Sequence, residues 1–179
     1  MIRRTRSRAP HAEVNIPSPF HSKRSGGVKP SIVVLHSTES HNAPGCADLV
    51  AVGKWFQNPA AQVSSHVCTD GEGHSARYVP DEPKAWHCAG ANSISLGVEQ
   101  IGQAAQTSWP TAQLKETAKW IAFWSRKYGI PIQSSTVHGV CRHSDLGAAG
   151  GGHHDPGPAY PLDRVLRYAK WFSRYGWTD

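Results

Sequence analysis

The pattern of hydrophobic and polar positions predicts several short strands. Residues 31–36 form a β-branched apolar run, which is typical of a strand buried on both faces. The other predicted strands are residues 63–69, 75–79, 94–101 and 136–140. Asp70-Gly71, between the second and third of these five strands, predicts the turn of a hairpin.

Helical spacing is clearest over residues 111–128, where Leu114, Ala118 and Ile121 recur on one face and Gly129 follows the last turn. The other predicted helices are residues 46–57 and 162–175, and the Gly- and Pro-rich stretch 147–158 is predicted to be a loop. Strands alternate with helices and one connection is a hairpin. We therefore expect an α/β fold: a single domain with a central mixed β-sheet flanked by helices.

The first 28 residues lack an apolar period and are rich in Arg, Ser, Pro and Gly. They are interpreted as a basic, loosely ordered N-terminal arm (1–28), followed by one folded domain (29–179). The charged start has no apolar core after it, so we expect no Sec-type signal peptide. No apolar run approaches the roughly 20 residues that cross a bilayer, so no transmembrane segment is expected either.

The net charge of +6 and the pI near 9.3 favour polyanionic partners such as nucleic acid, anionic lipid or the bacterial wall. Because the clustered basic and aromatic motifs of nucleic-acid-binding modules are missing, no nucleic-acid partner is expected. The four cysteines have no CxxC spacing, which argues against a four-cysteine zinc site. Four free thiols are favoured over two disulfides.

Histidines near strand ends and in glycine-rich loops are the candidates for chemistry. His36 ends the first strong strand, where it is either a packed residue or a rigidly mounted functional group. His143 and the stretch His153-His154-Asp155 offer imidazoles and a carboxylate. Two imidazoles and one carboxylate are a typical ligand set for catalytic zinc, although a histidine-rich loop can also be a flexible surface tract.

Glu99 interrupts the apolar strand 94–101. A carboxylate is costly to bury without a partner, so its position favours a functional role over packing. The two open interpretations are a general base for an attacking water and a solvent-facing residue on an edge strand.

Several short motifs occur together in one order along the chain. They are residues 34–38, 63–67, 85–90 and 96–99, then His143, and finally 154–158. In this order they resemble the type 2 N-acetylmuramoyl-L-alanine amidases, which include phage endolysins and peptidoglycan recognition proteins. The resemblance covers roughly residues 30 to 170.

The resemblance implies a role for each matching residue. His36, His143 and Asp155 are expected to be the ligands of one Zn²⁺, with Glu99 as the acid/base. The residues expected to line the substrate cleft are Trp86, His87, Asn92 and His154. Whether His154 instead competes as a metal ligand is left open. His66 is expected to be structural rather than a ligand.

His153 marks a departure from the family pattern. Many members have Lys or Arg at that position, two residues before the ligand aspartate. His153 is expected to stabilise the oxyanion in their place, with a charge that depends on pH.

The implied function is zinc-dependent hydrolysis of the amide between N-acetylmuramic acid and L-alanine of peptidoglycan. We expect a monomeric phage endolysin, or its catalytic module, held in the host cytoplasm until a holin-type partner releases it to the cell wall. The alternatives are a non-hydrolytic peptidoglycan-binding protein and a different zinc hydrolase on the same sheet.

Overall fold

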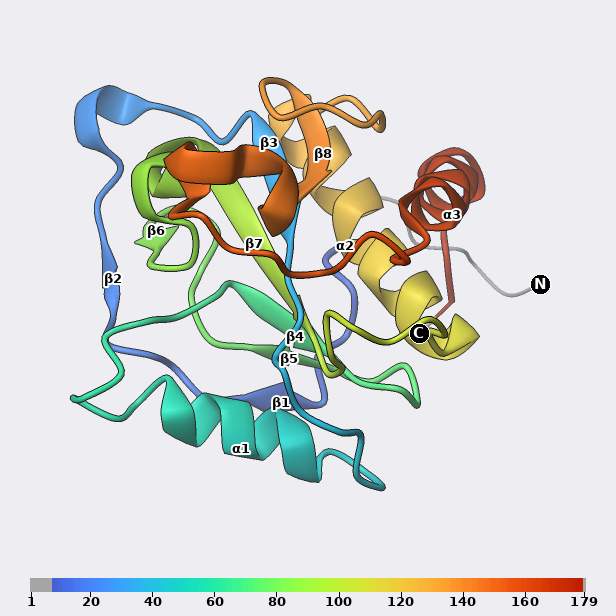
Figure 1. Cartoon of the computed structure of the whole chain (residues 1–179). Helices are drawn as coiled ribbons and strands as arrows, with labels where there is room; N and C mark the ends of the chain where they lie inside the picture. The colour runs from blue at the N-terminus through green and yellow to red at the C-terminus, as the bar shows by residue number, and fades with distance from the viewer. Residues whose placement is uncertain (1–7, 179) are drawn as a thin grey trace.

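A six-stranded mixed sheet runs through the centre of the computed structural model, which describes residues 8–178 (Figure 1). Its strands, in spatial order, are β1 (Val14–Asn15), β5 (Ser75–Arg77), β4 (Val67–Thr69), β7 (Ser95–Gln100), β3 (Ile32–Leu35) and β8 (Gly139–Arg142). The four strands from β4 to β8 are parallel, whereas β4 and β5 form an antiparallel hairpin. A separate antiparallel pair is formed by β2 (His21–Ser22) and β6 (Lys84–Ala85).

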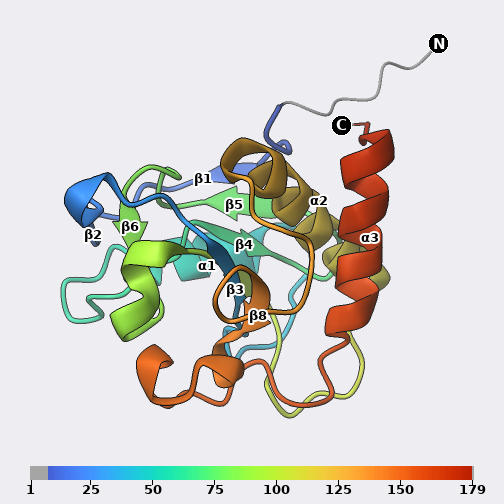
Figure 2. The ribbon, with the colours of Figure 1, turned by 90° about the horizontal axis from the view of Figure 1, so that it is seen from above.

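Helices cover both faces of this sheet. The α-helices are α1 (Ala47–Trp55), α2 (Thr111–Tyr128) and α3 (Leu162–Tyr175), and the 3₁₀ segments are η1 (Ser25–Gly27), η2 (Ala89–Ile94) and η3 (His143–Gly150). Figure 2 shows α2 and α3 packed side by side on one side of the sheet. η2 and η3 lie on the opposite side. Within residues 8–178, no helix has the length and apolarity to cross a membrane.

The alternation of side chains along β3 explains why the strand is apolar throughout. Val33 and Leu35 belong to the large core formed with α2 and α3. Ile32 and Val34 point to the other face and pack with Cys88, which precedes η2. Because both faces of β3 are covered, each of its four side chains is fully buried.

The predicted fold class is confirmed, and the two longer helices coincide with the predicted ranges. Other boundaries differ. The strand expected at 136–140 begins and ends later, as β8 (Gly139–Arg142). Residues 135–138 form a turn instead, because Ser135 Oγ accepts the backbone N–H groups of Val137 and His138. The loop expected at 147–158 begins later, since η3 extends to Gly150.

The expectation of a loosely ordered arm is wrong for the described residues 8–28. Val14 and Asn15 pair with β5 as an edge strand of the main sheet. Arg24 donates hydrogen bonds to the backbone carbonyls of Glu82, Pro83, Asn92, Ser93 and Ser95. Composition hid these contacts because a two-residue strand and a single half-buried guanidinium leave no hydrophobic period. Residues 1–7 of the proposed arm lie outside the described residues.

All four cysteines are free thiols, as favoured from the sequence. Cys68, Cys88 and Cys141 are buried, and Cys46 is partly exposed before α1. The packing of these residues therefore relies on their apolar character rather than on disulfide bonds.

Candidate metal centre and cleft

Three parallel strands bring the candidate residues to one edge of the sheet. His36 follows the middle strand β3, His143 follows β8 on one side of it, and Glu99 lies near the end of β7 on the other side. The carboxyl ends of parallel strands meet at the same edge, where binding sites of α/β folds usually lie. Asp155 comes from the loop after η3 and reaches the same place.

One ligand atom from each of His36, His143 and Asp155 lies within 4.8 Å of the other two, and all three residues are buried. His143 Nδ1 is 3.1 Å from Asp155 Oδ1, and His36 Nδ1 is 3.4 Å from Asp155 Oδ2. Two imidazole nitrogens therefore converge on one carboxylate. This donor set fits a tetrahedral metal such as zinc, with the fourth position open.

The other nitrogen of each imidazole is held by a neighbour. His143 Nε2 donates to Gly150 O at 2.7 Å, which leaves Nδ1 free of its proton. Metal-binding histidines commonly donate their second N–H to a carbonyl in this way, which fixes the tautomer and the ring orientation.

His36 is held by a longer chain of hydrogen bonds. Its Nε2 lies 2.9 Å from His87 Nδ1, and His87 Nε2 lies 3.0 Å from Ser95 Oγ, which donates to Ala91 O. Because the serine hydroxyl donates its one proton to the carbonyl, it accepts the N–H of His87. His87 Nδ1 then accepts the N–H of His36. The chain leaves His36 Nδ1 as an acceptor facing Asp155.

The protonation states at the site are those that a metal requires. Burial lowers the pKa of His36 to about 4, so its imidazole is neutral at pH 7. Burial opposes ionisation of Asp155, but the adjacent imidazole rings of His143 and His36 outweigh it and hold the pKa of its carboxyl below the usual range. Burial, then the neighbouring His36, lowers the pKa of His87 well below 6.5.

Glu99 is not on an edge strand, because β7 lies between β4 and β3. Its side chain lines the same cleft as the candidate ligands. Burial, together with the charges of Asp155 and Glu39, raises the pKa of the Glu99 carboxyl to about 8. A carboxyl group with a pKa near neutral is suited to moving protons, and this position supports the general-base interpretation over the solvent-facing one.

The cleft has a volume of about 790 Å³. Its floor holds the candidate ligands, and α1 supplies one wall through Ala51, Val52 and Trp55. Trp86, expected at the cleft, lines it with its indole N–H bonded to Ser22. Half of the Trp55 side chain is exposed, so the cleft presents aromatic surface to a bound molecule.

His153 and His154 both line the cleft on the exposed loop before Asp155. The ring of His153 stacks on that of His143 with centroids 4.4 Å apart, and its Nδ1 lies 3.7 Å from Asp155 Oδ1. Among the described residues, His154 is absent from the group of converging ligand atoms. The structure thus places His154 with the lining residues rather than with the ligands.

Two other expected residues have clear structural contacts. Asn92 lines the cleft, but its Oδ1 accepts the backbone N–H groups of His87 and Cys88 and so holds the segment that carries His87. His66 is fully buried, accepts the N–H of Gly97 at Nδ1 and bonds Pro83 O through Nε2. His66 is thus outside the candidate metal site.

Sequence reasoning missed Glu39 and Ser95. Glu39 accepts hydrogen bonds from Ser37 Oγ and the N–H of Ala104 at the rim of the cleft, and it contributes to the raised pKa of Glu99. Ser95 ends the hydrogen-bond chain from His36. Neither residue stands in a recognisable motif, and the only signal was the proximity of Glu39 to His36 in the sequence.

A mixed sheet with two imidazoles, a carboxylate and a partly buried glutamate at one open edge defines a candidate metallohydrolase. The family model described as N-acetylmuramoyl-L-alanine amidase matches residues 26–158. The chain therefore belongs to the N-acetylmuramoyl-L-alanine amidase family, as its motifs indicated.

Similar proteins agree with this assignment. N-acetylmuramoyl-L-alanine amidase A of Achromobacter lyticus is 29% identical over 107 residues, which cover 59% of this chain and 56% of that protein. The chain thus matches little more than half the length of that relative. Two solved structures share the fold. A selenomethionine derivative of AmpD has a TM-score of 0.70 and 20% identity over 93% of this chain and 99% of that one. The endolysin amidase LysCS of Clostridium intestinale has a TM-score of 0.65 and 18% identity over 92% and 98%.

Proposed function

We propose that this protein is a zinc-dependent amidase that hydrolyses the bond between the lactyl group of N-acetylmuramic acid and the L-alanine of peptidoglycan. The observation that carries the proposal is the convergence of His36, His143 and Asp155 beside Glu99 in an open cleft. Membership of the family indicates the substrate class, and the candidate ligands with Glu99 provide the groups needed for hydrolysis.

When bound by these three residues, zinc would supply Lewis acidity, polarising the amide carbonyl and lowering the pKa of water to about 7. The three residues already have the protonation states and the charge that metal binding requires. His36 and His143 present unprotonated Nδ1 atoms, and the single carboxylate of Asp155 leaves the site with a net positive charge. All three are fixed by hydrogen bonds to neighbouring residues, so the site is pre-organised.

Glu99 has the role of general base. Its carboxylate accepts the proton of the attacking water and returns it to the nitrogen of the departing alanine. His153 stands on the exposed side of the site, stacked on His143, where its imidazole can donate a hydrogen bond to the oxygen that becomes negative during attack. Trp86, His87 and His154 line the cleft that receives the substrate.

We extend the proposal to the biological setting of a phage endolysin or its catalytic module. The endolysin LysCS shares the fold, and the net charge of +6 favours adsorption to an anionic cell wall. In this setting the enzyme stays in the host cytoplasm as a monomer and reaches the wall through a holin-type partner. Expression in a bacterial host with and without a holin tests this: lysis that needs no holin would contradict it.

Digestion of purified peptidoglycan, with mass analysis of the products, tests the activity. The expected products are free stem peptides beginning with L-alanine and glycan with intact lactyl groups. A chelator should abolish their formation and added Zn²⁺ should restore it. Binding to the wall without release of peptides would identify a non-hydrolytic binding protein, and cleavage within the stem peptide would identify a peptidase.

A further inference from the structure

A second group of metal-binding side chains lies between the start of α1 and the tip of the β4–β5 hairpin. Cys46 comes just before α1, and Asp70 and His74 flank the hairpin turn. One ligand atom from each residue lies within 4.8 Å of the other two. None of the three lines the cleft described above, and the proposed amidase mechanism uses none of them.

The hairpin turn aims one carboxylate oxygen at this group. Asp70 Oδ1 accepts the backbone N–H groups of Glu72 and His74, which fixes the turn. Asp70 Oδ2 is left to face His74 Nδ1 at 2.9 Å. Zinc bonds of about 2.0–2.2 Å would place these two atoms about 3.4 Å apart, so a metal would require only a small movement.

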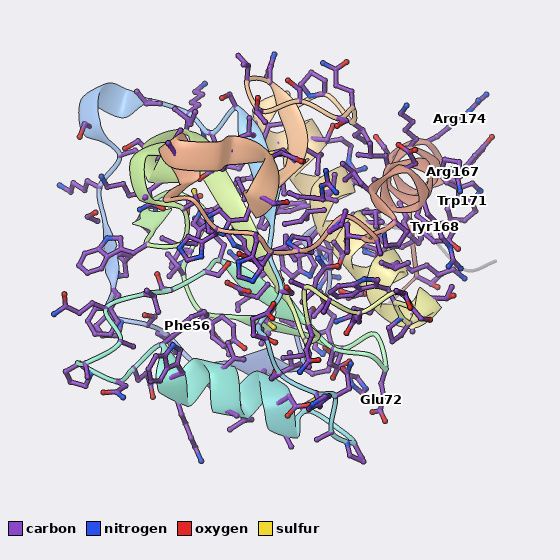
Figure 3. All side chains as sticks on the ribbon, in the orientation of Figure 1. Phe56, Glu72, Arg167, Tyr168, Trp171 and Arg174 are labelled. Atoms are coloured by element: carbon purple, nitrogen blue, oxygen red, sulfur yellow. The ribbon has the colours of Figure 1, made fainter. Side chains whose placement is uncertain are left out.

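Glu72 stands beside the group at the tip of the hairpin (Figure 3). Its Oε2 is 3.7 Å from His74 Nδ1 and accepts the N–H of Gly45, the residue before Cys46. The side chain is half exposed, so it can turn toward a bound ion. The hairpin and the start of α1 are thus already joined at the place where the candidate ligands meet.

The local charge is negative although the whole chain carries +6. The charged groups that act on both Cys46 and His74 are the carboxylates of Asp70, Glu72 and Glu13. This surrounding field disfavours a bare thiolate and favours a bound cation. Because Asp70 is almost fully buried, its charge is costly to desolvate, and a bound cation would offset more of that cost than it would for an exposed carboxylate.

We propose that Cys46, Asp70 and His74 form a second zinc site, with Glu72 as the fourth ligand. A thiolate, an imidazole and carboxylates in tetrahedral reach suit zinc better than magnesium or calcium, which prefer oxygen ligands alone. Binding releases the thiol proton of Cys46 and the Nδ1 proton of His74 to solvent. The ion would clamp the start of α1, a wall of the cleft, to the β4–β5 hairpin.

Cobalt binding tests this site separately from the catalytic one. Reduced, chelator-treated protein is titrated with Co²⁺, which gives an ultraviolet charge-transfer band only where a thiolate is a ligand. The expected result is two bound ions per chain and one such band, because the catalytic ligands contain no sulfur. Cys46→Ser should lose the band and one ion, whereas His36→Ala should lose one ion and keep the band.

A matched control and a second variant keep the result interpretable. Cys141→Ala removes a buried thiol of β8 and should keep the band. His74→Ala leaves the thiol in place and should weaken cobalt binding at this site at least about tenfold. Absence of the band in the wild-type protein, or its survival in Cys46→Ser, would overturn the proposal.

Thermal unfolding tests the clamp. In the His36→Ala background, zinc at a hundredfold excess over its Kd should raise Tm by roughly 5–10 °C. The added change Cys46→Ser should remove that shift. An equal shift in both proteins would show that the stabilising ion binds elsewhere.

Discussion

At the scale of single residues, the proposed mechanism gives the carboxyl group of Glu99 the role of general base. Glu99→Gln keeps the shape of the side chain but removes its ability to accept a proton. We expect turnover to fall by about 10²–10⁴-fold while the zinc content stays unchanged. Peptidoglycan digestion and metal analysis of the same preparation measure both quantities. The exposed Glu82, changed to Gln, serves as control, and wild-type turnover in Glu99→Gln would refute the general-base role.

We expect His87 to act on the candidate metal site through His36. His87→Ala removes the acceptor of the His36 Nε2–H, so the ring and tautomer of His36 are no longer fixed. Zinc affinity should fall about 10–100-fold. Competition with a chromophoric chelator measures it.

A conservative variant separates positioning from simple loss of packing. His87→Gln retains a carbonyl oxygen that can accept from His36, so it should recover part of the zinc affinity. The exposed His138, changed to Ala, should have no effect. If His87→Ala binds zinc as tightly as the wild type, the hydrogen-bond chain has no positioning role.

The sequence singled out the residues that converge in the cleft better than the residues that hold them in position. His36, His143, Asp155 and Glu99 stand in motifs of fixed order, and the structure brings them together. Ser95 was missed because a serine in a strand has no distinguishing pattern. Its role depends on a contact between η2 and β7, which local sequence does not encode.

At the scale of elements, a glycine of β7 makes room for His87. A Cβ atom at Gly97 would lie 2.7 Å from His87 Nδ1 and 2.7 Å from Ser65 Oγ. We expect Gly97→Ala to displace His87, to destabilise the fold by about 1–3 kcal/mol and to weaken zinc binding. Urea unfolding and chelator competition measure these two effects.

A double-mutant cycle with His87→Ala tests whether the two residues act together. Once His87 is truncated, Gly97→Ala should cost little further zinc affinity. Fully additive losses would mean that Gly97 affects the metal site by another route.

Long elements were predicted to the residue, but short ones were not. Helices α2 and α3 match their predicted bounds because amphipathic spacing over several turns is a strong local signal. β1 and β2 have two residues each, so their strand character depends on the partners β5 and β6 rather than on their own sequence. β8 begins later than predicted for a similar reason, because hydrogen bonds to the side chain of Ser135 form a turn before the strand.

At the scale of the whole molecule, Arg24 fastens the N-terminal segment to the domain. Arg24→Ala removes donors from five backbone carbonyls, and we expect a loss of about 2–4 kcal/mol in the free energy of unfolding. Urea denaturation measures it. The exposed neighbour Lys23, changed to Ala, should alter stability by no more than about 0.5 kcal/mol. Equal effects of the two variants would contradict the anchoring role of Arg24.

The buried imidazole of His66 makes stability depend on pH. Burial, together with the charge of Arg24, lowers its pKa to about 3, below the usual 6.5. The unfolded chain therefore binds more protons between these values, so the contribution is present above pH 6.5 and is lost as pH falls toward 3. His66→Gln should thus cost more stability at pH 7 than at pH 4.5. A cost that does not change with pH would show that His66 keeps an ordinary pKa in the folded protein.

The candidate metal ligands are far apart in the sequence: Ser37, next to His36, and Asp155 are separated by 118 positions. A nascent polypeptide would offer only isolated histidines until the ribosome has released Asp155. Metal loading at the candidate site must then wait until Asp155 has been synthesised. Translation products that end before this aspartate would lack one of the three candidate ligands and, on the proposed mechanism, would be unable to hydrolyse the wall.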